Sequence, residues 1–271
     1  MKHSQRCCPR SFLNLVLFVF LLSICSSFSF RGKGSAESKP IPDEVLESQI
    51  QGAWKMVEEN TSPWEDLGGW AQMKLISNGY FMVGVYDSKK KQFLNAAGGT
   101  YAVRNGKYTE YILFHTVDPS LVGKSFTFQI RVDGARLIQN GNVRIDGINM
   151  HLSEEYQRID YGTESPLAGA WRKQTVQQAY VNSQKRESTL MLTTGTRFQR
   201  VSYNSTTKRV GNVMGGTYSY RNNQWVETHK FNKNSPASIN RRFSYEARYE
   251  GRKMGIKKRS GYRPDTYIRL D

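Results

Sequence analysis

The sequence predicts an all-β chain in which one antiparallel unit, a barrel or a sandwich, occurs twice in tandem. Three observations predict it: apolar and polar residues alternate with period two in several short segments, turn signals separate these segments, and the same motifs recur at a fixed offset. Aromatic residues make up 12% of the chain and include 15 Tyr, which suits β-strands. A length of 271 residues leaves room for two domains of ordinary size.

Residues 1–29 are predicted to be a secretory signal peptide. Basic residues precede an apolar run from Phe12 to Leu22, and Ser27-Phe28-Ser29 predicts cleavage before Phe30. We therefore expect an exported protein, periplasmic or extracellular. The alternatives are a membrane anchor, for which the run is short, and a lipid anchor on Cys25, where Ile24 occupies a position that normally needs a small residue.

The cysteines and histidines argue against metal and thiol chemistry. All three cysteines lie in the leader: Cys7, Cys8 and Cys25. A mature chain would then have no disulfide, thiol nucleophile or thiolate ligand. His115, His151 and His229 share no ligand spacing, and the segment 193–196 is predicted to be a turn and not a phosphate loop. We expect no metal site and no cofactor.

The repeat defines the domains. Gly52-Ala53-Trp54-Lys55 recurs as Gly169-Ala170-Trp171-Arg172, and Gly98-Gly99-Thr100-Tyr101 recurs as Gly215-Gly216-Thr217-Tyr218, both at an offset of 117 residues (171 − 54). A unit of this length is a duplicated domain and not a solenoid repeat. The predicted divisions are a signal peptide (1–29), a flexible linker (30–47), a first barrel (48–160), a linker (161–166) and a second, basic barrel (167–271). The one helix candidate is short, at about 44–51.

Within each copy the alternation indicates antiparallel strands. Residues 126–132 alternate apolar and polar side chains, as do residues 243–249 in the second copy. Tyr108, Ile112 and Phe114 are expected to share one face of another strand. Turn signals such as Asn105-Gly106 and Asp133-Gly134 separate the strands.

Two motifs resemble those of lipocalin-type (calycin) barrels. Gly-x-Trp begins the unit and an Arg stands in its last strand; the matching pairs are Trp54 with Arg158 and Trp171 with Arg269. The resemblance implies that each Trp closes one end of a barrel and that the Arg packs over its indole. The run from Gly98 to Phe128 resembles secreted lipocalin-like domains of unknown function from Bacteroidetes-type bacteria. The second copy departs from that pattern, since Trp225-Val226-Glu227 replaces Tyr-Thr-Glu.

Glu110 and Glu227 are the candidates for chemistry inside the barrels. If each points inward with its apolar neighbours, it needs a hydrogen-bond donor or it stays protonated. It could anchor a ligand, act as a general acid or base, or be a structural carboxylate bonded to an internal Arg, Tyr or backbone group. The expected ligand-binding residues are Glu110, Tyr101, Tyr108, Phe114 and Phe126 in the first copy, and Glu227 and Trp225 in the second.

The positive charge is concentrated in the second copy. The formal net charge is +16, and residues 165–271 hold 21 basic and six acidic residues, against 12 and 15 in residues 44–164. The candidate polyanion-binding residues are Arg241, Arg242, Arg252, Lys253, Lys257, Lys258 and Arg259, and the run 251–259 is predicted to lie in a hairpin. Expected partners are an acidic glycan, a lipid headgroup or an acidic protein, with nucleic acid disfavoured by export. A solubilising surface is the plain alternative.

These observations favour an exported, non-enzymatic binding protein. It would hold a small apolar or amphipathic ligand in a barrel, with no membrane-spanning segment once the leader is removed. The alternatives are a structural or adhesion module with filled barrels and an enzyme that uses Glu110.

Overall fold

The computed structural model describes residues 41–57, 70–145, 147–174, 187–258 and 264–270. The predicted signal peptide, most of the first linker and Arg259 lie outside the described residues. The first element is helix α2 (Asp43–Ile50), which includes the last residues of the segment expected to be linker. The strands are β1 (Gly52–Met56), β2 (Trp70–Ser77), β3 (Tyr80–Asp87), β4 (Gln92–Arg104), β5 (Lys107–His115), β6 (Ser125–Asp133), β7 (Arg136–Ile145), β8 (Ile148–Asp160), β9 (Gly169–Lys173), β10 (Glu187–Thr193), β11 (Arg197–Asn204), β12 (Val210–Arg221), β13 (Gln224–Asn232), β14 (Arg242–Glu250), β15 (Lys253–Lys257) and β16 (Asp265–Leu270).

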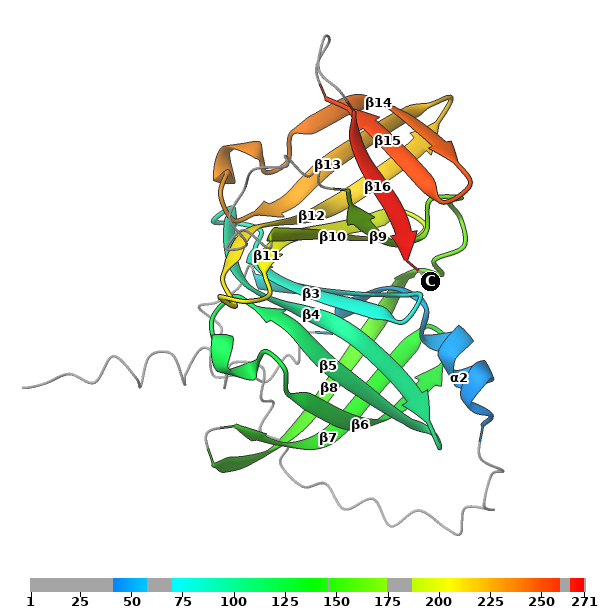
Figure 1. The fold of residues 1–271 in the computed structure, drawn as a ribbon. Helices are drawn as coiled ribbons and strands as arrows, with labels where there is room; N and C mark the ends of the chain where they lie inside the picture. The colour runs from blue at the N-terminus through cyan, green and yellow to red at the C-terminus, as the bar shows by residue number, and fades with distance from the viewer. Residues whose placement is uncertain (1–40, 58–69, 146, 175–186, 259–263, 271) are drawn as a thin grey trace, which may run out of the picture.

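The strands form two closed antiparallel barrels in tandem, β1–β8 and β9–β16 (Figure 1). Each strand pairs with the next, and the last strand of each barrel returns to pair with its first. The predicted all-β class and tandem organisation are thus confirmed, and the choice between sandwich and barrel is settled as barrel. Closure removes the exposed sheet edges that an open sheet would present.

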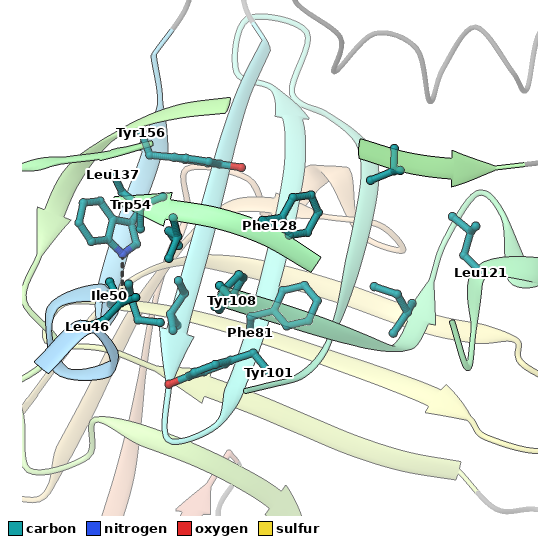
Figure 2. Packing of buried hydrophobic residues seen from close by; sticks show 14 residues of the cluster. Leu46, Ile50, Trp54, Phe81, Tyr101, Tyr108, Leu121, Phe128, Leu137 and Tyr156 are labelled. Atoms are coloured by element: carbon teal, nitrogen blue, oxygen red, sulfur yellow. Dashed lines mark hydrogen bonds between the residues drawn. The ribbon is translucent and has the colours of Figure 1, made fainter. Parts of the chain in front are cut away.

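Both barrels close in the same way at the start of their first strand. Trp54 lies opposite Arg158 across the β1–β8 seam, and Trp171 lies opposite Arg269 across the β9–β16 seam. Helix α2 covers that end of the first barrel and packs Leu46 and Ile50 against the indole of Trp54 (Figure 2). The helix is short and needs this tertiary contact to be stable.

A bulge explains why Gly-Gly-Thr-Tyr occurs in both copies. Gly98 pairs with Phe114 and Gly99 pairs with Ile112, so Leu113 is an extra residue on β5. A Cβ on Gly99 would lie 1.8 Å from the carbonyl oxygen of Tyr111, which only glycine avoids. The equivalent bulge in the second barrel lies between Gly215 and Gly216.

The bulge also corrects one prediction. An extra residue reverses the alternation, so Ile112 stays in the core of the first barrel whereas Phe114 points away from it. The expectation that Phe114 shares one face with Tyr108 and Ile112 was therefore wrong. Phe231, its counterpart 117 residues on, leaves the core of the second barrel for the same reason.

These two phenylalanines help to join the barrels. The Phe114 ring packs on Tyr203 of the second barrel with ring centres 5.9 Å apart, and Phe231 stacks on Tyr86 of the first at 5.2 Å. Since Phe231 corresponds to Phe114 and Tyr203 to Tyr86, the same contact is made twice in opposite directions. This is the pattern of an isologous, two-fold interface. One buried apolar cluster spans β2–β5 and β10–β13, where the barrels meet in Figure 1.

Polar contacts add to this interface. Asp160, the last residue of β8, accepts hydrogen bonds from the hydroxyls of Thr194 (2.8 Å) and Thr196 (2.9 Å) in the β10–β11 turn. Gln199 donates to the carbonyl oxygen of Met73 at 2.8 Å. The segment 193–196 thus forms a turn held by a carboxylate of the first barrel.

Candidate functional site

The first barrel contains a cavity of about 100 Å³. It occupies the half of the barrel away from Trp54, and its walls are mainly apolar. The polar side chains that line it are Gln72, Lys74, Asn95, Glu110, His115, Gln139, Glu154 and Tyr156. Val85, Phe126, Met150 and Leu152 line the cavity and are only half-buried, so it is not sealed from solvent at their end.

The opposite end is closed by the Trp54 plug. The Trp54 indole donates to the carbonyl oxygen of Ile50 at 2.8 Å (Figure 2). The Arg158 guanidinium lies 3.9 Å from the centre of the Trp54 ring and donates to the carbonyl oxygens of Gln51 (2.7 Å) and Gln49 (2.5 Å). In the described part of the chain, the cavity is therefore closed at the Trp54 end.

A buried ion pair crosses the inside of the barrel. Lys74 on β2 is 1% exposed, and its ammonium lies 2.7 Å from Oε1 of Glu110 and 2.6 Å from Oε1 of Gln139. The faces of Tyr108 and Phe81 lie 5.1 and 5.8 Å from the same nitrogen. Two polar partners and aromatic faces compensate the lost hydration of the ammonium.

A second polar group lies beside the ion pair. Gln72 donates to the Tyr156 hydroxyl at 2.7 Å and lies 3.5 Å from Oε1 of Glu154. The pKa of Glu154 is raised by burial, while the charge of Lys74 acts in the opposite direction. The carbonyl oxygen of the Gln72 side chain is buried and has no hydrogen-bond partner in the described residues. Among the described residues, the floor of the cavity thus holds one acceptor without a donor, the side-chain oxygen of Gln72.

His115 stands at the end of β5 and lines the cavity as well. Its Nδ1 accepts the backbone N–H of Asp118 at 2.8 Å. Burial lowers the pKa of His115 to about 4, although the nearby Asp118 carboxylate favours protonation. The imidazole is therefore neutral at pH 7 and contributes no charge to the cavity.

The second barrel has a polar network around its equivalent carboxylate, Glu227. Glu227 accepts from the Trp225 indole (2.7 Å) and from Arg200 (3.4 Å), and its other oxygen lies 3.0 Å from Nε2 of His229. His229 in turn contacts the hydroxyl of Ser238 at 2.9 Å. Burial opposes ionisation of Glu227, but Arg200, His229 and Trp225 together lower its pKa to about 2. This carboxylate is saturated, which marks it as structural.

The expected ligand-binding residues of the first barrel lie in four places. Glu110 and Phe126 line the cavity. Tyr108 lies behind it, against Lys74. Tyr101 belongs to the closed end, where its hydroxyl accepts from Gln51 at 2.6 Å, and Phe114 belongs to the interface between barrels.

The lysine partner of Glu110 was not predicted. The sequence feature that points to it is the polar pair Gln72 and Lys74, two residues apart on one face of the mostly apolar segment 70–77. An inward carboxylate was expected to need a hydrogen-bond donor such as an internal Arg, Tyr or backbone group, and only strand pairing shows that the donor is Lys74 on β2. Gln139 and Glu154 were missed for the same reason, since β7 and β8 bring them to this floor.

The basic residues of the second barrel lie on its surface in two groups. Arg241 and Arg242 precede and begin β14, and the run 252–258 begins in the β14–β15 turn and continues through β15, so this part of the predicted hairpin is observed. In that hairpin Lys253 pairs in register with Glu250, and Lys257 pairs with Glu246. Glu250 and Glu246 therefore partly neutralise the positive charge of the run 252–258.

Among the described residues, no three His, Cys, Asp or Glu side chains are grouped to hold a metal ion. No helix within the described ranges is long and apolar enough to cross a membrane.

A comparison with known protein families finds a match over the first barrel. A family model described as a domain of unknown function (DUF4488) matches residues 49–167. That span runs from the end of α2 through β8 to the linker, so the chain is similar to this family over the barrel that contains the cavity. The comparison with curated proteins gives no match. Over its first barrel, the chain thus resembles a family defined by sequence and not by an activity.

Proposed function

We propose that this protein is an exported, non-enzymatic binding protein that holds a small amphipathic molecule inside its first barrel. The observation that carries the proposal is the difference between two copies of one fold. The first barrel has an apolar-walled cavity with a polar floor, whereas the second places buried Arg200 and His229 at the positions of Val83 and Ile112, two residues that line that cavity. Pockets of this composition provide burial through their walls and orientation through a few polar groups.

The lipocalin-like motifs support the same role. The Trp and Arg that carry the resemblance lie together at the closed end of each barrel. Export rests on the predicted leader, and its test is the N-terminus of the mature protein from its host. We expect mass spectrometry to find a chain that begins at Phe30; a chain that retains residues 1–29 would contradict export by this route.

The test of binding is native mass spectrometry of the protein purified from its own host. We expect a bound small molecule in the wild type and its loss in Val143→Phe, which places a ring in the cavity. Val57→Phe is the matched control, because Val57 is 42% exposed and outside the cavity. A wild type that is always empty, or a ligand that survives Val143→Phe, would refute the proposal.

A second role, docking on an anionic surface, is favoured by the uneven charge. Arg241, Arg242, Arg252, Lys253 and Lys258 are exposed and Lys257 is half-exposed. We expect Arg241→Gln/Arg242→Gln to elute from a sulfated-glycan resin at lower salt than the wild type. Lys107→Gln/Lys124→Gln removes two exposed charges from the first barrel and should leave elution unchanged. If both double variants eluted at equally lowered salt, retention on the resin would depend on net charge alone and not on Arg241 and Arg242.

An enzymatic role for Glu110 has less support. Its carboxylate already pairs with Lys74 at 2.7 Å, which is the arrangement of a structural ion pair.

A further inference from the structure

We infer that the molecule held in the first barrel carries a primary amine, bound as the ammonium against the carboxyl group of Glu154 and the side-chain oxygen of Gln72. This inference rests on the proposed cavity function and adds the chemistry of the head group. It follows from the acceptor left open on the cavity floor, from the charge of the lining residues, and from the pairing of Lys74, the one lysine among the described lining residues, with Glu110.

The first step is the open acceptor. Gln72 is 1% exposed and lines the cavity, and its side-chain nitrogen donates to the Tyr156 hydroxyl and to Glu154. Its side-chain oxygen is buried and has no partner among the described residues. Such an oxygen costs free energy unless a donor reaches it, so this position selects a hydrogen-bond donor.

The second step is the charge balance. The described ionisable groups lining the cavity are Lys74, Glu110, Glu154, His115 and Tyr156. The imidazole is neutral at pH 7, and burial raises the pKa of the Tyr156 hydroxyl well above its ordinary value, so that it is neutral as well. Lys74 is paired with Glu110. Glu154 is left as a second carboxyl group, 7% exposed, with no salt bridge in the described residues. Burial raises the pKa of this carboxyl group, and an ammonium beside it would favour the ionised form, whereas a carboxylate head group would add a third acid beside one lysine.

The third step concerns the shape of the donor. Gln72 and Glu154 are neighbours, since the amide nitrogen of one lies 3.5 Å from a carboxyl oxygen of the other. An ammonium has three N–H donors and no acceptor, and it can serve both groups at once. A hydroxyl has one donor and serves only one of them. The apolar walls then receive the carbon chain of the amine.

The second barrel provides an internal comparison. Its position equivalent to Gln72 is Thr189, which has no side-chain amide, and the counterpart of Glu154 on its last strand is Asp265. Asp265 already pairs with Lys173 at 2.7 Å and with Lys258 at 3.0 Å, so it is not left for an incoming amine. The head-group site is thus specific to the first copy.

The test uses the full chain and three four-carbon probes with different head groups: n-butylamine, 1-butanol and butanoate. Binding is measured by NMR titration at pH 7. We expect butylamine to bind at least tenfold more tightly than butanol and butanoate to bind most weakly. In Glu154→Gln the affinity for butylamine should fall at least tenfold while that for butanol stays unchanged.

Glu155→Gln is the matched control, because Glu155 is the next residue on β8 and pairs with Arg136 on the outside of the barrel. It should bind all three probes as the wild type does. Glu154→Gln preserves the shape of the side chain, and its unfolding temperature checks that the barrel is intact. If butanol or butanoate binds as tightly as butylamine, or if Glu154→Gln leaves the preference unchanged, the amine inference is refuted but cavity binding stands. If none of the three probes binds, both the amine inference and the proposed binding in the cavity are refuted.

Discussion

Glu110 and Glu227 occupy equivalent positions in the two barrels, 117 residues apart, yet each takes its cation from a different strand. Glu110 pairs with Lys74 on β2, and Glu227 pairs with Arg200 on β11, the counterpart of β3. At the position of Lys74 the second barrel has Met191, and at the position of Arg200 the first has Val83. The duplicated fold keeps a buried carboxylate and exchanges the strand that neutralises it.

This exchange predicts a compensated double variant. Lys74→Met should lower the free energy of unfolding by about 3–5 kcal/mol, because it leaves Glu110 buried without its cation. Adding Val83→Arg reproduces the arrangement of the second barrel and should recover part of the loss. Urea unfolding of both single variants and the double variant gives the coupling energy. A double variant no more stable than Lys74→Met would show that β3 cannot supply the charge.

The two-fold interface predicts matched effects of Phe114→Ala and Phe231→Ala. Both rings are buried in the cluster between the barrels, so each variant should lose about 3–5 kcal/mol of unfolding free energy. Tyr111→Ala is the control: Tyr111 is 44% exposed, and its loss should be about 0.5 kcal/mol or less. Denaturant unfolding measures all three. If either phenylalanine variant behaved like Tyr111→Ala, that ring would not hold the barrels together.

The neutral His115 predicts a loss of stability in mild acid. Its pKa is about 4 in the folded protein, below the ordinary 6.5, so the unfolded chain takes up the proton first as the pH falls. The contribution is fully present above about pH 6.5 and is lost between pH 6.5 and 4, by up to about 3 kcal/mol. His115→Asn keeps an acceptor near the Asp118 N–H and does not titrate, so its unfolding free energy should fall less over that range.

His151→Asn is the control for this measurement, because His151 is exposed on β8. It should keep the pH dependence of the wild type. Parallel curves for the wild type and His115→Asn between pH 6.5 and 4 would assign the acid sensitivity to other groups.

The two Trp–Arg plugs predict unequal costs of Arg→Lys substitution. Arg158 donates to two backbone carbonyls, whereas Arg269 donates through its guanidinium to one, that of Pro166. A lysine cannot reproduce the planar fork. Arg158→Lys should therefore cost about 2 kcal/mol of unfolding free energy, and Arg269→Lys should cost less. An Arg269→Lys loss equal to or greater than that of Arg158→Lys would contradict this account.

Some features of the fold could be predicted from particular residues. The recurrence of Gly-x-Trp and of Gly-Gly-Thr-Tyr indicated two copies of one unit, and period-two alternation indicated strands. Phe114 could not be placed, because the bulge at Leu113 reverses its direction. A bulge changes one pairing in a ladder and leaves the apolar pattern of the strand intact, so the sequence pattern carries little sign of it.

By itself the sequence determined the all-β class, the duplication and the identity of the carboxylate in each barrel, because these depend on local alternation and on repeated motifs. Only the tertiary structure decided which cation meets Glu110, that Gln72 and Glu154 share the cavity floor, and that Phe114 joins the barrels. The physical reason is that these groups come from strands far apart in the chain. Their contacts are fixed by barrel closure and pairing register, and a one-residue shift in register turns a side chain from the inside to the outside.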